Sequence, residues 1–461
     1  MCSSDLDAMP SILWFRRDLR LGDNPALLVA VDAARADGDG RVVPLFVVDP
    51  ALWDTAGAPR QAYLVASLDA LGASLGRRLL IQHGDPRRIL PDLIRASGAR
   101  SVHIAADFAP YGMTRDTAVE AALAELGVPL VRTGSSYAVA PGRVTKDDGT
   151  AYRVFTPFYK AWTRHGWRAP ALSAGDVDWW EPVPCQGRPP APHLEGLALP
   201  RAGEDAALER WTAYRSLGLA EYAELRNRPD LPATSVMSHH LRWGEIHPRT
   251  MLADLGDGDE VFRKEICWRE FYADVLHQAP QSVRQSLDPR FDERMDWAEG
   301  PQAEAHFAAW AEGRTGYPFV DAGMRQLRQT GWMHNRVRMV VASFLVKDLH
   351  LPWQRGAAEF MRWLIDGDVA SNVHGWQWTA GCGTDAAPFY RVFNPVLQGV
   401  KFDPEGDYVR QYVPELRHLP GASAHEPWKA PDGYAHGYPA PIVEHSAERD
   451  VALADFAALK E

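Results

Sequence analysis

Cysteine is scarce in this 461-residue chain, and its few cysteines are far apart. None belongs to a Cys-x-x-Cys pair; the four are Cys2, Cys185, Cys267 and Cys382. This spacing argues against a disulfide framework and against a cysteine-based zinc site, and it fits the reducing cytosol. We therefore expect a cytoplasmic protein without a bound metal.

Long apolar runs and export signals are also missing. No stretch reaches the roughly 18 apolar residues that a membrane-spanning helix requires. The opening residues, MCSSDLDAMP, contain neither a basic nor an apolar region of the kind that directs secretion. We expect no membrane partner.

Two nucleotide-binding motifs and an excess of positive charge are absent as well. No GxGxxG follows a predicted strand and neither GxxxxGKS nor GxxxxGKT occurs, so the usual dinucleotide and P-loop interpretations have no support. The formal net charge is −11, which argues against a general nucleic-acid binder. A local basic face can still exist within an acidic average.

Tryptophan, by contrast, is abundant: the chain has 17, more of them in its C-terminal half. With 46% apolar and 24% charged residues, the composition is that of a soluble globular protein. The length predicts two or three domains.

The first part of the chain alternates between two patterns. Apolar runs predict strands at 11–15, 42–48, 79–81, 102–106 and 128–131, and helical patterns lie near 61–76, 86–97 and 114–126. Buried strands that alternate with amphipathic helices indicate a five-stranded parallel sheet with helices on both faces. We predict an α/β, Rossmann-like domain over residues 10–135.

The rest of the chain reads differently. Seven prolines interrupt residues 166–203, and proline breaks regular elements. Beyond this stretch the apolar periodicity is helical almost throughout. We predict an interdomain connector over 136–203 and a larger all-helical domain over 204–450.

Two motifs of the helical part carry polar groups. TSVMS, at 234–238, has three hydroxyls that can bind phosphate oxygens at a helix start, although an ordinary N-cap by Thr234 or Ser238 explains it equally. In FRKEICWREFY, the side chains of Glu265, Trp268 and Arg269 share one helix face. That face is a polar-aromatic surface, or else a plain Glu265–Arg269 ion pair beside a half-buried indole.

Two further motifs follow. GWMHNRVRM places Asn335 and Met339 on one helix face, within a stretch (314–362) of eight basic and three acidic residues. Basic residues among aromatics suit phosphates and stacked bases, and a solvated basic surface is the alternative. In LIDGDVASNVHGWQW, Asp366 and Asp368 flank Gly367, either as Mg²⁺ ligands or as acceptors for N–H and hydroxyl groups.

These motifs occur in the order found in a known family. Together with SILWFRRDLRLGDNPAL, GRTGYPFVDAGMRQL and TGWMHNRVRMVVASFLVKDL, they resemble the photolyase–cryptochrome family from about Ser11 to about His445, most of all its class I cyclobutane pyrimidine dimer repair enzymes. The resemblance implies an α/β antenna domain followed by a helical domain that binds FAD in a folded form. It disfavours the Mg²⁺ interpretation of the aspartates.

Carried over residue by residue, the resemblance implies a FAD site. Its contacts are Tyr222, Thr234, Ser235, Val236, Met237, Ser238, Phe262, Arg269, Arg338, Asp366, Gly367, Asp368 and Asn372. Within this set, Arg338 and Asp366 are expected to form a buried ion pair, and Asn372 to face the flavin N5 edge. Phe262 stands where close relatives often have tryptophan.

The implied activity is light-driven repair of UV-damaged DNA, a carbon–carbon lyase reaction in which reduced FAD donates an electron to a flipped-out pyrimidine dimer. The implied catalytic residues are Glu265, Asn335, Met339, Trp268, Trp378 and Asn372. The DNA contacts are Arg226, Trp268, Asn335, Arg336, Trp378 and Gln398, and the electron-transfer chain is Trp297, Trp353 and Trp376. Relatives that repair (6–4) photoproducts have histidines in place of Asn335 and Met339. The alternative function is a cryptochrome-type blue-light photoreceptor without repair activity.

The resemblance also implies a second chromophore. Arg60, Asp107 and Arg115 match polar contacts of members that bind a deazaflavin, whereas folate-binding members have a glutamate near the position of Gly112. We therefore favour 8-hydroxy-5-deazaflavin over 5,10-methenyltetrahydrofolate as antenna, and the further alternatives are a flavin or an empty site. We expect a monomer that binds UV-damaged DNA and associates with the nucleoid of a prokaryote.

Overall fold

A computed structural model describes residues 9–385 and 390–459. Its first part is a parallel sheet with the strand order β3-β2-β1-β4-β5, and a two-residue strand, β6, pairs with β2. The strands are β1 (Ser11–Phe15), β2 (Arg41–Val48), β3 (Leu80–His83), β4 (Ser101–Ala106), β5 (Leu130–Ser135) and β6 (Asp178–Trp179). The prediction of a five-stranded parallel sheet is confirmed.

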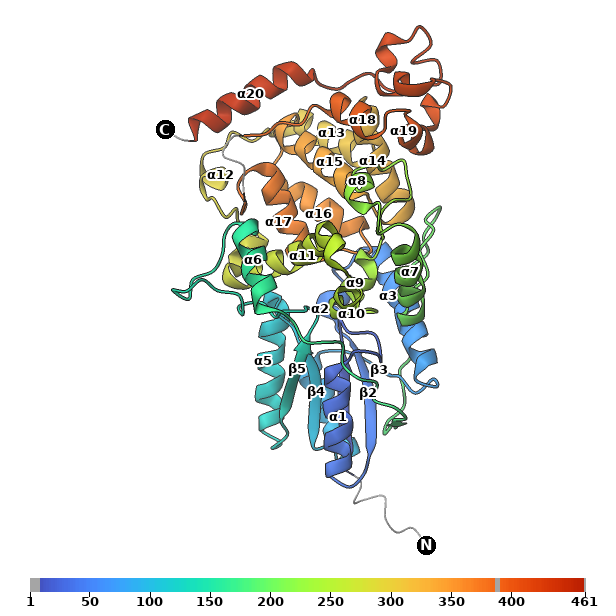
Figure 1. Ribbon diagram of the computed structural model, residues 1–461, viewed down its shortest axis with the longest axis vertical. Coiled ribbons are helices and arrows are strands. Elements are labelled where there is room, and N and C mark those ends of the chain that lie inside the picture. Colours follow the sequence, from blue (N-terminus) through green and yellow to red (C-terminus); the bar gives the residue numbers. More distant parts are fainter. Residues whose placement is uncertain (1–8, 386–389, 460–461) are drawn as a thin grey trace.

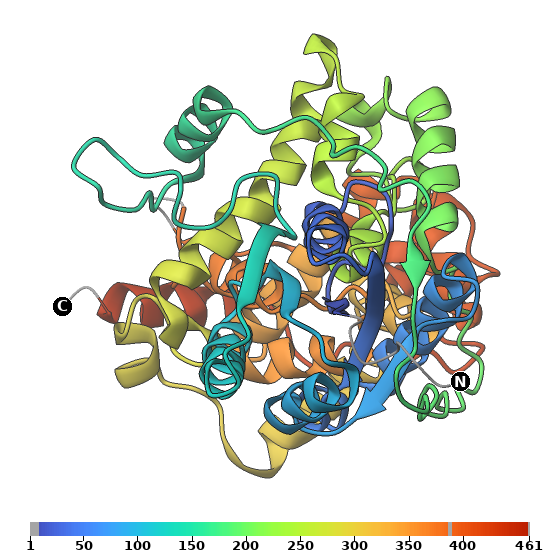
Figure 2. The ribbon, with the colours of Figure 1, turned by 90° about the horizontal axis from the view of Figure 1, so that it is seen from below.

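Helices cover both faces of this sheet, because neighbouring strand residues point to opposite sides. Leu13 and Phe15 pack with α1 (Pro25–Ala36) and α3 (Ala58–Ser74) on one face. Ile12 and Trp14 pack with α4 (Pro86–Ser97) and α5 (Pro110–Ala124) on the other. The view from below shows α1 and α5 on opposite sides of the strands (Figure 2).

Some elements of the first 203 residues were not predicted. Helix α1 begins with the sequence Asn24-Pro25, and the Asn24 side chain caps it by accepting the Leu27 amide at 3.3 Å. The short helix α2 (Pro50–Trp53) follows β2. The predicted connector contains the helix α6 (Phe155–His165), which lies beside α11 (Figure 1). The boundaries at 135 and 203 stay predictions.

From residue 204 onward the described residues form α-helices and short 3-10 turns, in agreement with the predicted all-helical part. The α-helices are α7 (Glu204–Leu217), α8 (Tyr222–Leu225), α9 (Ser238–Trp243), α10 (Pro248–Ala253), α11 (Glu260–Gln278), α12 (Arg290–Glu293), α13 (Gly300–Ala311), α14 (Pro318–Thr330), α15 (Asn335–Lys347), α16 (Trp353–Trp363), α17 (Val369–Ala380), α18 (Pro395–Phe402), α19 (Asp407–Tyr412) and α20 (His445–Ala458). Their largest core is built around α14, α15 and α16.

The sheet and the helical part pack directly against each other (Figure 1). Trp243, at the end of α9, packs into the core of the sheet's α1 and α3 side, and its indole donates to the Ile365 carbonyl at 3.2 Å. The Arg17 guanidinium, just beyond β1, reaches the Asp368 carboxylate at 2.6 Å. The carboxyl ends of the strands therefore face the segment that precedes α17.

In the described part of the chain, no helix combines the length and the apolar character needed to cross a membrane. The same residues contain no cluster of histidine, cysteine and carboxylate side chains with the geometry of a metal site. Of the four cysteines, three are free thiols and Cys2 lies outside the described residues.

Candidate functional site

Four segments that are distant in sequence supply most of the predicted FAD and dimer-pocket residues. They are the loop before α9, the helix α11, the start of α15 and the loop that leads into α17. Helix α17 is central, because it packs against α11, α15 and α16.

Asp366 lies in this loop and is buried. The Arg338 guanidinium donates to its Oδ2 at 2.8 Å, so the expected ion pair forms, although a quarter of the arginine side chain stays exposed. Among the described residues, the buried Asp366 Oδ1 has no hydrogen-bond partner. A buried carboxylate oxygen without a donor is costly, and an N–H group of a bound ring would satisfy it. This oxygen fits the predicted flavin contact.

Asp368 caps α17 and joins the two halves of the molecule. Its Oδ1 accepts the Ser371 amide at 3.0 Å, and its Oδ2 pairs with Arg17. Burial by itself would raise the pKa of this carboxyl, but the Arg17 guanidinium and two further arginines, Arg269 and Arg242, hold it well below its usual range. Asp368 is thus ionised, and the N-cap of α17 carries a negative charge.

Asn372 lies one turn into α17 and is buried. Its amide nitrogen donates to the Ala357 carbonyl of α16 at 2.9 Å. That bond fixes the orientation of the side chain and leaves its oxygen to accept from another group.

The loop at 234–238 has a strained backbone. Val236 adopts a φ of +50°, a left-handed conformation that β-branched residues rarely occupy. The Ser235 carbonyl accepts from Arg210 at 2.6 Å, and the Ser238 hydroxyl accepts from the Trp332 indole at 3.2 Å. Strain of this kind collects at ligand-binding sites. The simple capping explanation is wrong, because Met237 occupies the N-cap of α9 and no side chain caps it.

Three predicted FAD contacts line the same region from α8 and α11. The Phe262 ring is buried, and Tyr222 meets it edge-on with the ring centres 5.0 Å apart. The Arg269 guanidinium donates to the Ser136 carbonyl at 2.8 Å and lies 4.6 Å from the Tyr137 ring centre. An ion pair between Glu265 and Arg269 is therefore not what holds this helix face, and that alternative is wrong.

Glu265 pairs instead with Arg226, at the end of α8. The two charged groups lie 2.7 Å apart, and each side chain is a little more than a quarter exposed. Burial raises the pKa of the Glu265 carboxyl, while the Arg226 guanidinium opposes the shift. A carboxyl with a raised pKa keeps its proton to a higher pH and can then donate a hydrogen bond.

Trp268 lies on the same face of α11 as Glu265 and has a partner that the sequence did not reveal. The Phe155 ring of α6 stacks on the Trp268 indole, with centres 3.7 Å apart and planes 6° apart. Phe155 lies in the predicted connector. Trp378, in the last turn of α17, is partly buried.

The start of α15 is open to solvent. Asn335 is exposed and Met339 is half-buried. The Arg336 guanidinium donates to the Asn227 side chain at 2.8 Å. In the described residues the buried Gln398 Oε1 has no hydrogen-bond partner.

The three tryptophans expected to carry electrons belong to one core. Trp353 and Trp376 are almost fully buried, and Trp297 packs against the same cluster. Gly356 lies one turn after Trp353, and an added Cβ would come within 2.1 Å of the Trp376 ring. The absent side chain lets Trp376 lie directly on the helix that carries Trp353.

Most cations of the basic stretch at 314–362 have an acidic partner or are buried. Four of its arginines pair with glutamates, three of which lie outside the stretch: Arg314 with Glu312, Arg325 with Glu415, Arg355 with Glu304 and Arg362 with Glu359. Arg338 pairs with Asp366, and Lys347 is buried with its ammonium on the Arg391 carbonyl. In the described residues, Arg328 and Arg336 have no carboxylate partner, and the role of the stretch as a DNA-binding face stays a prediction.

The three predicted antenna residues line one cavity of about 310 Å³. It lies where segments following β1, β2 and β4 face the α17 loop, at the point where the strand order reverses, which is where open α/β sheets bind ligands. Its walls are rich in aromatic rings. Its charged lining residues are Arg16, Arg17, Arg60, Arg115, Arg242, Asp49, Asp107 and Asp368.

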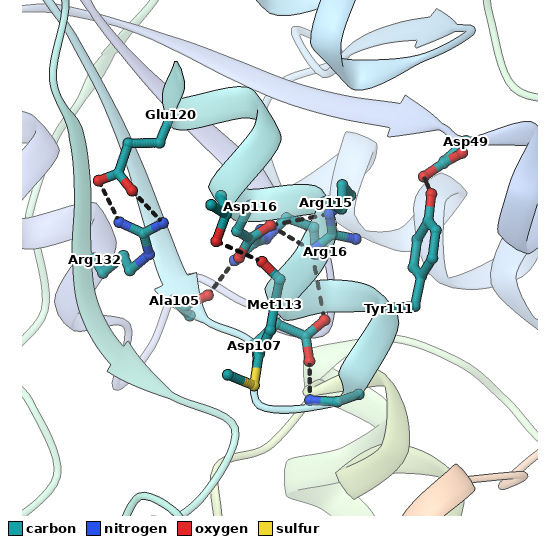
Figure 3. Close-up of polar contacts among 12 residues, drawn as sticks. Arg16, Asp49, Ala105, Asp107, Tyr111, Met113, Arg115, Asp116, Glu120 and Arg132 are labelled. Atoms are coloured by element: carbon teal, nitrogen blue, oxygen red, sulfur yellow. Dashed lines mark hydrogen bonds and ion pairs between the residues drawn. The ribbon is translucent and has the colours of Figure 1, made fainter. Parts of the chain in front are cut away.

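Figure 3 shows the polar network on one side of this cavity. The Arg115 guanidinium lies 2.8 Å from Asp116 and 3.5 Å from Asp107, and Arg16 lies 2.9 Å from Asp116. Burial alone would raise the pKa of Asp107, but Arg17, Arg115 and Arg16 lower it overall. A Cβ on Gly112 would come within 2.2 Å of the Asp107 carboxylate. A glutamate at position 112 would therefore displace Asp107.

Comparison with known proteins gives the same picture across the chain. A family model described as DNA photolyase matches residues 11–176, and one described as the FAD binding domain of DNA photolyase matches residues 262–458. The deoxyribodipyrimidine photo-lyases of Agrobacterium fabrum and Escherichia coli are 40% and 38% identical, and each alignment covers at least 98% of both chains.

Solved structures agree. A class III photolyase from Agrobacterium tumefaciens superposes with a TM-score of 0.88 at 38% identity and 99% coverage of both chains. A Synechocystis cryptochrome superposes with a TM-score of 0.86 at 28% identity, over 96% of this chain and 99% of the other. The chain belongs to the DNA photolyase family, and its helical part is the FAD-binding domain of that family.

Proposed function

We propose that this protein uses light to split cyclobutane pyrimidine dimers in UV-damaged DNA. The observation that carries the proposal is the pairing, on one face of α11, of a half-buried carboxyl of raised pKa and an ordered indole, Glu265 and Trp268. Relatives named for this activity are also more similar to the chain than the cryptochrome is.

The pocket acts first by binding the lesion outside the duplex. Flipping a base out of the stack costs a few kcal/mol, and less for a lesion that already pairs badly. Trp268 and Trp378 recover part of that cost by stacking, worth roughly 1–3 kcal/mol per base. Arg226, Arg336 and Gln398 hold the lesion strand, and Asn335 and Met339 contact the dimer.

Glu265 then acts through its proton. Because burial raises its pKa, the carboxyl is an O–H donor over a wider pH range than a free glutamate. It donates to a pyrimidine carbonyl and stabilises negative charge on the dimer while the ring opens. Arg226 limits this range by favouring the ionised form.

The residues assigned to FAD would hold it, and the unpartnered Asp366 Oδ1 and the strained 234–238 loop support that assignment. Bound there in its reduced form, FAD would contribute light-driven electron transfer to the dimer. Trp376, Trp353 and Trp297 lie in one core and provide a path for reducing equivalents to the site.

The test uses an oligonucleotide that carries one thymine dimer. FAD-loaded, reduced protein is illuminated with blue light, and a second sample stays dark. We expect intact thymines to return only in the light. FAD that is bound and reducible without any repair would move the protein to the photoreceptor class.

We further propose that the cavity of Arg60, Asp107 and Arg115 binds 8-hydroxy-5-deazaflavin. Five arginines against three aspartates give its lining an excess of positive charge, which suits a planar chromophore with an ionisable hydroxyl. The Sulfolobus tokodaii photolyase, 28% identical with a TM-score of 0.83, was solved with two FAD molecules, so a second flavin is the competing occupant.

Reconstitution decides between the occupants. Protein stripped of small molecules is titrated with 8-hydroxy-5-deazaflavin, FAD and 5,10-methenyltetrahydrofolate, and the absorption of each complex is recorded. We expect the deazaflavin to bind most tightly and Gly112→Ala, which displaces Asp107, to weaken it at least tenfold. Gly258→Ala is the control, because a Cβ there meets no atom within 4 Å. Tighter binding of either other ligand overturns the proposal.

A further inference from the structure

The stacked pair of Phe155 and Trp268 joins two elements that the reaction itself does not require to touch. Trp268 belongs to α11, and Phe155 is the first residue of α6. With Phe155 3.7 Å away and parallel, one face of the indole is covered. Only the opposite face or the edge of Trp268 remains for a pyrimidine ring.

Phe155 is itself held by the loop that follows α17. Its backbone N–H donates to the Asp385 carboxylate at 3.0 Å, and the Asp385 N–H donates to the Arg153 carbonyl at 3.1 Å. The two segments are therefore fastened in both directions. Asp385 adopts a φ of +56°, which aspartate tolerates better than most residues.

The Asp385 loop is tied in turn to the end of α17. The amides of Gly381, Cys382 and Gly383 all donate to the Gln377 carbonyl, at distances of 2.9 to 3.1 Å. A Cβ on Gly383 would lie 2.8 Å from the backbone nitrogen of Trp378, so the loop folds tightly against the last turn of α17. The backbone of the last turn of α17, which carries Trp378, is thus linked through the loop, Asp385 and Phe155 to Trp268.

We propose that Phe155 and Asp385 form a clamp that sets the plane of Trp268 and its placement relative to Trp378, and so determines how well the pocket accepts a pyrimidine dimer. Both are positioning residues, because they act through Trp268. The inference rests on the proposed function, since it assigns Trp268 and Trp378 to the walls of the dimer pocket.

Dark binding of DNA tests the clamp. FAD-loaded protein is titrated with two oligonucleotides of one sequence, with and without a thymine dimer. A stacked aromatic pair contributes modestly, so we expect Phe155→Leu to weaken dimer binding by about 3- to 10-fold and to leave undamaged DNA unaffected. Repair per absorbed photon at saturating DNA should stay within twofold, which separates positioning from chemistry. Phe155→Tyr, which keeps the ring, should restore binding.

Three variants show whether the effect passes through the contacts described. Asp385→Ala should resemble Phe155→Leu, and Asp385→Asn, which still accepts the amide, should resemble the wild type. In a Trp268→Ala background, Phe155→Leu should cause no additional loss, because coupled residues are not additive. Phe158→Leu is the matched control: Phe158 is buried in the same helix and packs on Phe271.

A second measurement needs no DNA. The indole cross-peak of Trp268, assigned by its loss in Trp268→Phe, should move in ¹⁵N-tryptophan spectra of Phe155→Leu and stay in place in Phe158→Leu. An unmoved peak with unchanged dimer affinity overturns the clamp, as does equal loss of affinity in both leucine variants. If the wild type fails to prefer dimer DNA while the peak moves as expected, the proposed function fails and the clamp stands as a device that orients Trp268.

Discussion

At the scale of single residues, the proton on Glu265 decides the pH dependence of repair. Its pKa is raised in the folded protein, so the protonated carboxyl persists above the pH at which a free glutamate ionises. If the proton is donated to the lesion, repair per absorbed photon falls as pH rises through this raised pKa. Glu265→Ala should lower the yield about 10-fold, as expected for a lost hydrogen bond to a charged group.

Two variants separate the proton from the side chain. Glu265→Gln keeps an N–H donor at all pH values, so its yield should not fall with pH. Arg226→Gln removes the cation that opposes the pKa shift and should move the fall to higher pH. Glu260→Gln, on the same helix but paired with Lys264, should behave as the wild type. A Glu265→Gln profile that follows the wild-type curve means that another group titrates.

The sequence predicted which residues share a helix face but not what they contact. Glu265 and Trp268 are three positions apart on α11, so their common face follows from helix geometry. Their partners, Arg226 and Phe155, come from other elements and are defined only by tertiary packing. The predicted ion pair of Arg338 and Asp366 forms, but it came from family resemblance and not from residue spacing.

At the scale of an element, Asp368 determines how securely α17 is fixed. Asp368→Ala removes the helix cap and leaves the Arg17 guanidinium partly buried without its partner, so we expect the free energy of unfolding to fall by about 3 kcal/mol. Asp368→Asn keeps an oxygen for the cap and loses only the ion pair, so we expect the free energy of unfolding to fall by about 2 kcal/mol. Calorimetric unfolding of FAD-loaded protein measures both.

The same aspartate gives an acid dependence with a definite sign. The folded-state pKa of Asp368 is lowered, so its contribution to stability is complete above the unfolded-state value of about 3.9 and is lost as pH falls through the folded-state value. The stability difference between wild type and Asp368→Asn should therefore be equal at pH 7 and pH 5 and shrink only in stronger acid. Asp32→Asn, at an exposed position of α1, should show no difference at any pH. If the stability difference between wild type and Asp368→Asn already shrinks between pH 7 and pH 5, the pKa of Asp368 is not lowered as stated.

Element prediction succeeded where one pattern dominated. Each predicted strand overlaps an observed one, because buried parallel strands are short apolar runs between turn residues. Helix α1 was missed although Asn24 and Pro25 are an ordinary N-terminal signal. Helix α6 was missed because its context read as a connector, and its role depends on the contact with α11.

At the scale of the whole molecule, an acidic protein must bind an acidic polymer. The net charge is −11, and five of the seven arginines of the 314–362 stretch pair with carboxylates, so few cations of that stretch are available to phosphates. Each phosphate contact adds about one to the slope of log affinity against log salt concentration. The DNA-binding slope of this protein should therefore be small, and each contacting arginine should be a large part of it.

The contribution of a single arginine to the salt slope of DNA binding can be measured at Arg336. It lies beside the site at the start of α15, where its guanidinium contacts the neutral Asn227 side chain and the Phe402 ring, so its charge is available to a phosphate. Arg336→Gln should weaken dimer-containing and undamaged DNA alike and lower the salt slope by about one. Arg355 belongs to the same stretch but is bound to Glu304. The salt slope of the Arg355→Gln variant should therefore equal that of the wild type. Equal slopes for all three proteins would place the phosphate contacts elsewhere on the surface. A loss confined to dimer-containing DNA would make Arg336 a lesion contact that leaves the phosphate backbone to other residues.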